Sequence, residues 1–522
     1  MGLKERIVDR GKRVLSKPAV LRWVSDDRVM KAAEGVLDAR MRMRAAWRIL
    51  LDGHELPAID PALDESIGSS APPPSSEAPS KLNGSNGAHG ANGTNGTSLQ
   101  ARAAGSSDMH ESLKERSTLA GIGGRDVFDK CFAFSAADNA RKMGIYPFFR
   151  ALDFNDGPEA VMDGRRVVMF GSNNYLGLTT HPKVREAARA AIDRFGTSMT
   201  GSRLVNGSMK LHEEFEERLA AWFGKESAIV FTTGYQVNLA VCSALLSNKK
   251  SVGLIDRNVH ASLYDGVRLG QASGARLVRY RHNDAESLDR ALEKLDPGEG
   301  ALVITDGVFS AEGEIAKLDE IVPVVKKHGA RLFVDDAHAL GVIGPGGHGT
   351  AHHFGVSGEV DLMGGTFSKS LASIGGWLVG ERKVLDYVRH FAPSFMFAAS
   401  AAPPSVAAAM TAFEVMHEES WRIDKLRENF TYMRDELRRL GFELGHTQTA
   451  VIPIFIRQDL RTIMMWRDLL EDYGVYTNPF ISPGVPPKNA MLRTSYMATH
   501  EKSHLDRGLE AFEKVGKKYG VI

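Results

Sequence analysis

From about residue 119 to the C-terminus, short apolar runs alternate with segments whose apolar residues recur every three or four positions. The apolar runs predict buried strands: AIVF (228–231), VGLID (252–256), LVITDG (302–307), RLFVDD (331–336) and DLMGG (361–365). Amphipathic segments such as MKLHEEFEERLAAWFG (209–224) lie between them and predict helices. This alternation is typical of βαβ units, so we predict an α/β fold with a mostly parallel central sheet covered on both faces.

The same patterning divides the chain into five parts. Residues 1–60 show a helical spacing of apolar residues and predict an N-terminal helical extension. Residues 61–118 are rich in Pro, Ser, Gly and Asn and predict a flexible low-complexity linker. The dense region that follows is predicted to comprise an N-terminal segment (119–208), a large domain (209–395) and a small C-terminal α+β domain (396–522).

Composition narrows the function classes. The 522 residues carry a formal net charge of +1, so no global field attracts nucleic acid. Cys131 and Cys242 lie far apart without metal-ligand spacing, which suits a reducing compartment. No run of eighteen apolar residues and no secretory signal is visible, so we expect a cytoplasmic protein.

The N-terminal extension is locally basic. Residues 1–50 hold 13 Lys or Arg and 6 Asp or Glu, a net charge of +7. One interpretation is a helical hairpin with a solvated basic face. The alternative is a contact surface for anionic lipid at a membrane, or for an acidic carrier protein.

Residues with chemistry follow the predicted strands. TTGYQVN comes after the first strand and places free backbone N–H groups at a helix start, where an anion binds well. The next four strands are followed by His260, by Ser310, by Asp335 with His338, and by Lys369, respectively. Ligands of open α/β sheets bind at the carboxyl ends of the strands, so these groups are expected to meet at one edge. A lysine for a Schiff base, an acid, an anion site and a flat group are what pyridoxal phosphate requires.

Two other motifs resemble binding sites but do not predict one. GPGGHG (344–349) satisfies G-x-G-x-x-G but does not join a strand directly to a helix, so a dinucleotide site is not expected. His348, His352 and His353 have no carboxylate or cysteine at ligand spacing. We therefore expect solvated histidines on a loop and no metal.

Six motifs in order resemble the α-oxoamine synthase family of pyridoxal-phosphate enzymes, over roughly residue 125 to the end. They are SNNYLGL (172–178), TGSRLVNGS (200–208), HASLYDG (260–266), DGVFSAEGE (306–314), DDAHALGVIG (335–344) and TFSKSLASIGG (366–376). The resemblance implies the fold-type I transferase architecture, with 209–395 as the pyridoxal-phosphate-binding domain. It also implies an obligate homodimer with active sites at the interface.

The resemblance also implies a role for each matching residue. Lys369 would form the internal aldimine, Asp335 would hold the pyridine nitrogen protonated and His260 would stack on the ring. His338 and Ser310 would contact the phenolic oxygen of the ring. The phosphate would bind to the backbone of Thr233, Gly234 and Tyr235, helped by Thr366. Asn174 would reach the substrate region, either of its own subunit or of the partner subunit.

The implied reaction is a decarboxylative Claisen condensation of an amino acid with an acyl thioester, carried by acyl-CoA or by an acyl carrier protein. Many family members bind the amino-acid carboxylate with the first arginine of an R-L-R ending. Here Met491 occupies that position and Arg493 matches the second arginine. Bacterial serine palmitoyltransferases are similar in this respect, and in them the stacking histidine, here His260, helps to hold the carboxylate. The resemblance thus favours L-serine with a long-chain acyl thioester, giving 3-ketosphinganine, the first step of sphingolipid synthesis.

Other readings of the resemblance remain. FMFAASAAPPS (395–405) has Ala398 and Ala399 where the family has phosphate-binding Ser and Thr, so Ser400 is the candidate substitute. Another α-oxoamine synthase would use glycine or alanine, as 8-amino-7-oxononanoate synthase or 2-amino-3-ketobutyrate CoA ligase does. The alternative with a different kind of function is a catalytically inactive regulatory subunit. Retention of Lys369, Asp335 and His260 argues against it.

Overall fold

The computed structural model describes residues 126–486 and 488–522. The predictions for residues 1–60 and 61–118 lie outside the described residues. Residues 126–139 form a unit separate from residues 140–522 and contain α6 (Asp129–Phe132) and the start of α7 (Ala136–Lys142). The architecture below is that of residues 140–522.

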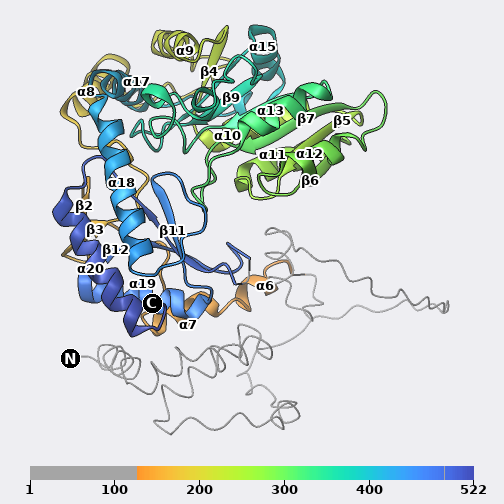
Figure 1. Ribbon diagram of the computed structural model, residues 1–522. Coiled ribbons are helices and arrows are strands. Elements are labelled where there is room, and N and C mark those ends of the chain that lie inside the picture. The colour runs from red at the N-terminus through yellow and green to blue at the C-terminus, as the bar shows by residue number, and fades with distance from the viewer. Residues whose placement is uncertain (1–125, 487) are drawn as a thin grey trace, which may run out of the picture. The chain divides into compact units, whose positions relative to one another are not determined.

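A seven-stranded sheet forms the core of the larger lobe (Figure 1). Its order is β4-β10-β9-β8-β7-β5-β6. The strands are β4 (Ser227–Phe231), β5 (Ser251–Asp256), β6 (Arg276–Tyr280), β7 (Gly300–Asp306), β8 (Arg331–Asp335), β9 (Leu362–Thr366) and β10 (Gly376–Gly380). Neighbours from β9 to β6 pair in parallel, whereas β10 is antiparallel to both β4 and β9. The sheet is therefore mostly parallel, as predicted.

All five apolar runs are strands of this sheet. Every residue of β4 and β5 is buried, which is why these strands appear in the sequence as continuous apolar runs without alternation. The apolar runs did not predict β10. That strand is five residues long and bounded by glycines, and it directly follows the motif that carries Lys369.

The larger lobe also contains helices, several of which pack on the sheet, and the predicted amphipathic segment is one of these. They are α8 (Pro182–Phe195), α9 (Lys210–Phe223), α10 (Gly234–Leu245), α11 (Ala261–Gln271), α12 (Ala285–Leu292), α13 (Leu318–Lys327), α14 (Thr350–His353), α15 (Arg382–Phe391), α16 (Pro393–Met396) and α17 (Pro403–Glu418), with the 3₁₀ turn η2 (Pro345–Gly347). Thr233 caps α10, where its Oγ1 accepts from the backbone N–H of Gln236 and the Gln236 side chain accepts from the N–H of Thr233. This capping box fixes where α10 begins.

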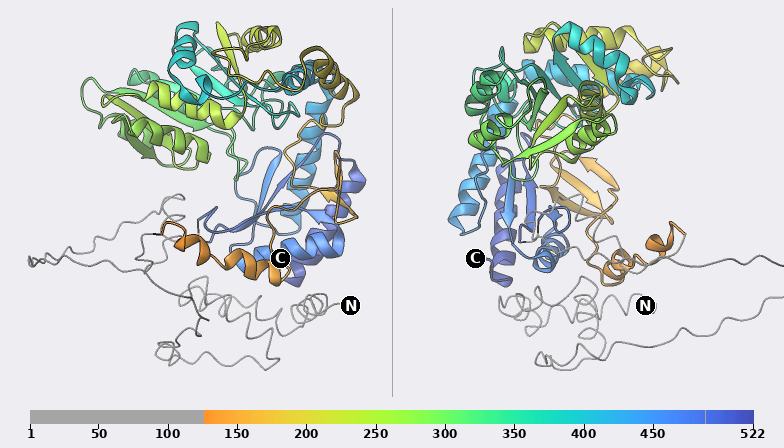
Figure 2. Two further views of the ribbon diagram at one scale, coloured as in Figure 1. Left: turned by 180° about the vertical axis from the view of Figure 1, so that it is seen from behind. Right: turned by 90° about the vertical axis from the view of Figure 1, so that its right-hand side faces the viewer.

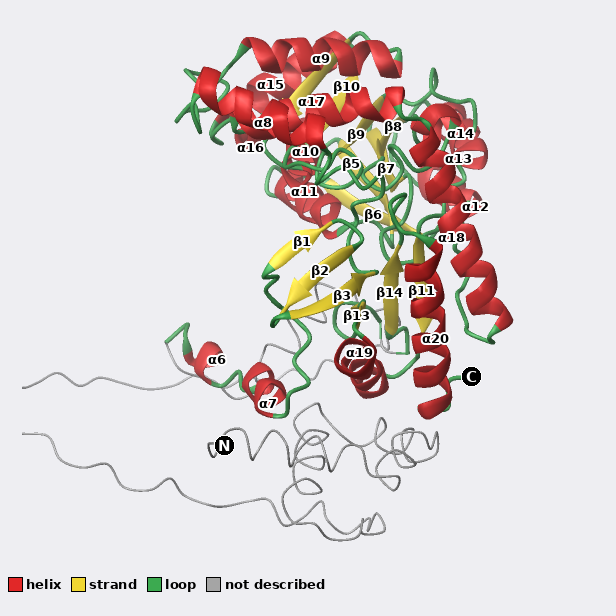
Figure 3. Ribbon diagram, turned by 90° about the vertical axis from the view of Figure 1, so that its left-hand side faces the viewer, coloured by secondary structure: helices red, strands yellow, loops and turns green. Residues whose placement is uncertain are grey.

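Two smaller sheets form the second lobe (Figure 3). One is β1 (Phe154–Asp156), β2 (Glu159–Met162), β3 (Arg165–Met169) and β12 (Val475–Tyr476); the other is β11 (Val451–Phe455), β14 (Met491–Ser495) and β13 (Asn478–Phe480). The helices there are α18 (Trp421–Arg439), α19 (Asp459–Tyr473) and α20 (Lys502–Lys518). β12 pairs in parallel with β3, so strands from residues 154–169 complete the small lobe that the sequence assigned to residues 396–522.

α18 connects the two lobes, and the views from behind and from the side show the same separation (Figure 2). Its buried residues pack toward β11 and α20. Among the described residues, no helix combines the length and the low charge needed to cross a membrane.

Candidate active site

The carboxyl ends of the central strands bring together most of the predicted site residues. Thr233 follows β4, His260 follows β5 and Ser310 follows β7. Asp335 is the last residue of β8, and Lys369 follows β9. Because these strands point the same way, their loops meet at one edge of the sheet. Lys369 lies close enough to Asp335, His260 and Arg493 for their charges to act on one another, so these groups share one edge.

The start of α10 forms a cradle against Thr366. A Cβ atom built on Gly234 would lie 2.6 Å from Cβ of Thr366, so only glycine allows the two backbones this close. Gly234 and Tyr235 are the first residues of the helix, and their N–H groups have no intrahelical acceptor. Thr366 Oγ1 lies 2.9 Å from Ser368 Oγ. Backbone donors, the helix dipole and two hydroxyl groups together suit a phosphate.

Lys369 and Asp335 supply the amine and the acid of this edge. Burial lowers the pKa of Lys369 to about 8, although Asp335 opposes that shift. Asp335 is buried, and its Oδ1 accepts the backbone N–H of Ala337 at 3.0 Å. Its Oδ2 accepts Nδ2 of Asn238 at 2.6 Å. A neutral amine is therefore accessible near neutral pH beside a fixed carboxylate.

His260 occupies the N-cap of α11 between these groups. Its backbone N–H donates to both carboxylate oxygens of the buried Asp306, at 3.3 and 3.2 Å. Its Nδ1 lies 2.7 Å from Oγ of Ser262, while the residue as a whole stays exposed. The surrounding protein removes water from the Nδ1 edge and lowers the pKa of His260. The ring is thus anchored at one edge and open elsewhere, which suits a stacking group.

His338 and Arg493 both interact with the side chain of Tyr175 at this edge. The Tyr175 hydroxyl lies 2.6 Å from Nδ1 of His338, and burial raises the pKa of Tyr175 to about 12. Burial and the nearby charge of Lys369 hold the pKa of His338 well below its usual range. Arg493 is buried on β14 and donates from Nε to the carbonyl oxygen of Ser310 at 2.7 Å. The small lobe therefore contributes a fixed positive charge to the site.

Two predicted residues, Asn174 and Ser400, do not point into this cluster within the chain. The side chain of Asn174 donates to Thr179 Oγ1 and accepts the N–H of Leu178, so it closes its own turn. Tyr235 keeps its backbone N–H at the start of α10, while its hydroxyl donates to the carboxylate of Asp265. Ser400 donates its backbone N–H to the carbonyl of Gly201 at 2.9 Å. A role for Asn174 or Ser400 in a partner's site stays a prediction.

Comparison with known proteins identifies the fold of residues 165–512, which match the family model for aminotransferase class I and II. A serine palmitoyltransferase of Sphingobacterium spiritivorum is 43% identical over 385 residues, covering 74% of this chain and 95% of the relative. A solved structure of SPT with a pyridoxal-phosphate internal aldimine superposes with a TM-score of 0.72 at 35% identity, covering 76% of this chain and all of the other.

The chain belongs to the α-oxoamine synthases. It has the fold-type I transferase fold, its cofactor is pyridoxal phosphate and it is a pyridoxal-phosphate-dependent acyltransferase. An 8-amino-7-oxononanoate synthase of Thermoanaerobacter pseudethanolicus is 37% identical over 76% of this chain and 99% of the relative. The similarity to two named types of α-oxoamine synthase thus establishes the family.

The residues of this α-oxoamine synthase fit its cofactor. The cradle of α10 and Thr366 would hold the phosphate, and the Lys369 amine would bond the aldehyde carbon. Asp335 is held as a hydrogen-bond acceptor and would face the pyridine nitrogen, with His260 against the ring. An amine, an acid and an anion cradle for the cofactor are thus present at this one edge.

Three site residues of this synthase were missed in the sequence. Tyr175 lies inside the quoted motif SNNYLGL and Ser262 inside HASLYDG, so the motifs themselves could have indicated them. Asn238 has no such signal, because it is a single polar residue in the apolar helix GYQVNLAVCSAL. Only the packing of α10 shows that its side chain reaches Asp335.

The expectation of solvated histidines at 348–353 was wrong for two of the three. His348 stacks on Trp222 with ring centroids 3.5 Å apart, and His352 is half-buried on α14. Of the residues the structure describes, only a surface group has three potential ligand atoms close together: Asp289, Glu293 and His328. The Lys327 ammonium also bonds Asp289, so a lysine already neutralises that group.

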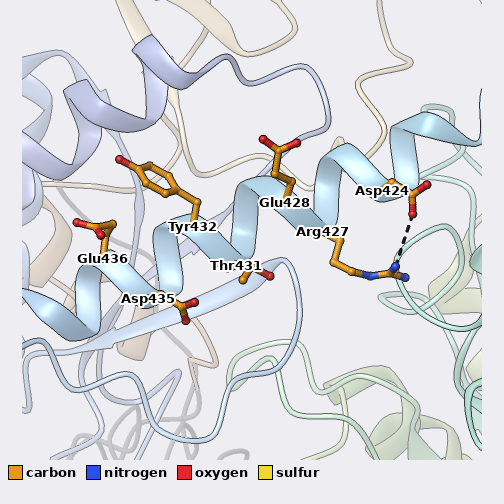
Figure 4. A pocket seen from close by; sticks show the side chains of 7 residues that line it. All are labelled: Asp424, Arg427, Glu428, Thr431, Tyr432, Asp435 and Glu436. Carbon is orange, nitrogen blue, oxygen red and sulfur yellow. Dashed lines mark ion pairs between the residues drawn. The ribbon is translucent and has the colours of Figure 1, made fainter.

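A separate hollow lies along one side of α18 (Figure 4). It is lined by Asp424, Arg427, Glu428, Thr431, Tyr432, Asp435 and Glu436. Asp424 pairs with Arg427 at 3.5 Å within the same helix. All lining residues belong to one helix and none is a predicted site residue, so the hollow is distinct from the catalytic edge.

Proposed function

We propose that this α-oxoamine synthase condenses L-serine with a long-chain acyl thioester and releases carbon dioxide, the free thiol of the acyl carrier and 3-ketosphinganine. The observation that carries the proposal is the environment of Met491. This residue is 2% exposed on β14 and pairs across the sheet with Phe455 and Phe480. An arginine side chain there would bring an unpaired charge among apolar neighbours, at substantial cost.

The carboxylate of the amino acid therefore needs other donors. Arg493 lies two residues along the same strand and is already oriented by Ser310 and Ser495, at 2.7 Å each. The exposed edge of His260 supplies a further N–H group. This donor set, without a second arginine, is the arrangement that the sequence shares with bacterial serine palmitoyltransferases, and relatives of that name are 41–43% identical to the chain.

The chain's own residues account for the proton movements. Bound pyridoxal phosphate supplies an electron-accepting ring that makes the Cα proton of the amino acid acidic. The Lys369 amine would take that proton, because its lowered pKa of about 8 leaves a usable fraction neutral. Asp335 would provide the fixed negative charge that favours a protonated pyridine nitrogen. Lys369 would also be the group that returns a proton to Cα.

A homodimer is part of the proposal. Exposed apolar side chains lie on the segments that flank the catalytic edge, and burying them would stabilise association. They are Leu204 and Val205 in the motif TGSRLVNGS, Ile374 in the lysine loop and Phe397 beside Ala398, with exposed fractions of 50, 71, 62 and 75%. A second copy covering these residues would bring its own side chains to the site.

The N-terminal segment is proposed to serve the acyl donor. Its net charge of +7 over residues 1–50 suits either an anionic membrane surface, where a lipid product would go, or an acidic acyl carrier protein.

Absorbance titration of the purified protein tests the substrate. The visible band of the bound cofactor is recorded during addition of L-serine, glycine and L-alanine. A spectral change that saturates with L-serine at the lowest concentration supports the proposal. A change with glycine or alanine alone would favour the oxononanoate synthase type of reaction, to which the 37% identical relative belongs by name.

A further inference from the structure

A chain of buried hydrogen bonds links Asp335 to His260. Nδ2 of Asn238 donates to Oδ2 of Asp335 at 2.6 Å and to Oγ of Ser262 at 2.8 Å. Ser262 Oγ in turn lies 2.7 Å from Nδ1 of His260. Asn238 is 2% exposed and Ser262 is fully buried, so water does not compete for these bonds.

Close packing of α10 on α11 makes the chain of bonds geometrically possible. A Cβ atom on Gly266 would lie 2.7 Å from the backbone oxygen of Asn238, so a larger residue there would push the helices apart. Asn238 on α10 can therefore reach Ser262 on the first turn of α11. The motif HASLYDG therefore has glycine at position 266 because α10 and α11 pack closely there.

The direction of each bond follows from groups with a fixed role, because a backbone N–H only donates and a carboxylate only accepts. The backbone N–H of Ser262 donates to Nδ1 of His260 at 3.3 Å, which requires Nδ1 to carry no proton. Ser262 Oγ must then donate its own hydrogen to the same nitrogen. The two hydrogens of the Asn238 amide are used by Ser262 and by Asp335, because an ionised carboxylate can only accept.

We propose that Asn238 and Ser262 are positioning residues that hold His260 as the neutral imidazole with its proton on Nε2. Asn238 donates in both directions, so no proton passes between Asp335 and His260 along this path. If Nδ1 of His260 carried a proton, Oγ of Ser262 would face two donors, Nδ2 of Asn238 and Nδ1 of His260. The hydrogen of the Ser262 hydroxyl would then have no acceptor in this chain of bonds.

Several charged groups surround the ring of His260. The carboxylates of Asp335 and Asp265 favour a charged imidazole, whereas Lys369 disfavours it. The Asp306 carboxylate accepts the backbone N–H of His260. The rings of Tyr235 and His338 are the other titratable groups nearby. Burial outweighs the acids and lowers the pKa of His260. The Nε2–H group is then available as a donor to the substrate carboxylate, a consequence that rests on the proposed function.

Nitrogen NMR of the full-length holoenzyme tests the proposal independently of the substrate. The imidazole nitrogens of ¹⁵N-histidine-labelled protein are observed from pH 6 to 8, and the His260 signals are assigned by their loss in His260→Gln. We expect wild-type His260 to show Nε2 protonated and Nδ1 unprotonated throughout. Ser262→Ala should give a mixture of tautomers or titration within this range.

Matched variants separate positioning from a general effect on folding. Ser262→Thr retains the hydroxyl group and should restore the wild-type signals. Ser243→Ala removes another hydroxyl from α10, one that has no hydrogen-bond partner among the described residues, and should leave the His260 signals unchanged. Asn238→Ser removes the double donor and should shift the His260 signals as Ser262→Ala does. The proposal is overturned if wild-type Nδ1 carries the proton, or if Ser262→Ala and Asn238→Ser both keep the wild-type tautomer.

Amino-acid binding provides a second readout. From the net value of one hydrogen bond, Ser262→Ala should weaken the apparent Kd for the amino acid about threefold to tenfold at pH 8. It should change kcat less. Failure of L-serine to bind the wild-type enzyme would overturn the proposed substrate while leaving the NMR result as evidence on the tautomer. An altered tautomer with unchanged binding of the preferred amino acid would overturn the inferred use of Nε2–H.

Discussion

Arg493 on β14 donates from Nε to the backbone carbonyl of Ser310, 2.7 Å away, and so joins the small lobe to the loop after β7. The same guanidinium donates from Nη1 to Oγ of Ser495. The side chain is 3% exposed. A residue that the sequence indicates only as a substrate ligand is thus also a structural link between the lobes.

We expect Arg493→Lys to weaken the link between the lobes and, under the proposed function, the binding of L-serine. A single ammonium group cannot replace two divergent guanidinium donors, so one buried acceptor would lose its partner at a cost of about 1–3 kcal/mol. Binding of L-serine, measured by absorbance titration, should weaken about tenfold or more. Ser495→Ala removes only the second bond and should have a smaller effect on both. Equal binding by wild type and Arg493→Lys would exclude Arg493 from substrate recognition.

Gly234→Ala should weaken cofactor binding without unfolding the protein. The new methyl group would lie 2.6 Å from Cβ of Thr366, so the start of α10 or the β9 loop must move and the phosphate cradle widens. Equilibrium dialysis against pyridoxal phosphate should show an affinity at least about tenfold lower. The control is Gly358→Ala, where a Cβ meets nothing within 4 Å. An unchanged affinity in Gly234→Ala would contradict the placement of the phosphate.

Lys369 should destabilise the cofactor-free protein below pH 8. Burial lowers its pKa to about 8 from 10.5, so between these values the unfolded chain binds a proton that the folded chain does not. Stability therefore rises with pH through that window, and below it the penalty is about 3 kcal/mol. Lys369→Met should melt at a higher temperature than wild type at pH 7, with the difference shrinking toward pH 10. Calorimetry can compare it with Lys383→Met, which alters an exposed lysine of α15. A difference independent of pH would contradict the prediction.

The large sheet and its catalytic edge follow from local signals, whereas the bonds between elements do not. Continuous apolar runs identify buried parallel strands, and parallel strands place His260, Asp335 and Lys369 at one edge wherever the helices pack. Pairing of β3 with β12 joins residues about 300 positions apart, and neither strand contains a sign of the other. Asn238 likewise has meaning only after α10 lies against α11. Sequence thus locates the reacting groups, and tertiary packing determines what orients them.

Removal of residues 1–118 should separate catalysis from recruitment of the acyl donor. The net charge of +7 predicts that the full chain binds vesicles containing anionic lipid, or an acidic carrier protein, more tightly than the truncated chain does at low salt. Co-sedimentation with vesicles and steady-state kinetics with an acyl carrier protein measure the two effects. Binding of L-serine should not change. Unchanged membrane association together with unchanged carrier kinetics would contradict both proposed roles.

His282 should stabilise the loop that carries Ser310 in a pH-dependent manner. Its Nδ1 lies 3.1 Å from the fully buried carboxylate of Asp256, and its Nε2 lies 3.5 Å from Glu314. Burial opposes a charge on the ring, but the hydrogen bonds to these two carboxylates outweigh it and raise the pKa of His282 to about 10. The folded state therefore holds a proton that the unfolded state releases above about pH 6.5.

The stabilising contribution of His282 is accordingly complete below about pH 6.5 and is lost as pH rises toward 10. His282→Phe leaves Asp256 buried without its cation and should cost about 3–5 kcal/mol at pH 6.5. Denaturant titrations from pH 6.5 to 10 should show the gap between the two proteins narrowing with rising pH. His328→Phe, which breaks a partly exposed pair with Asp289, should cost less than about 1 kcal/mol. A gap that stays constant or widens with pH would show that His282 is neutral in the folded protein.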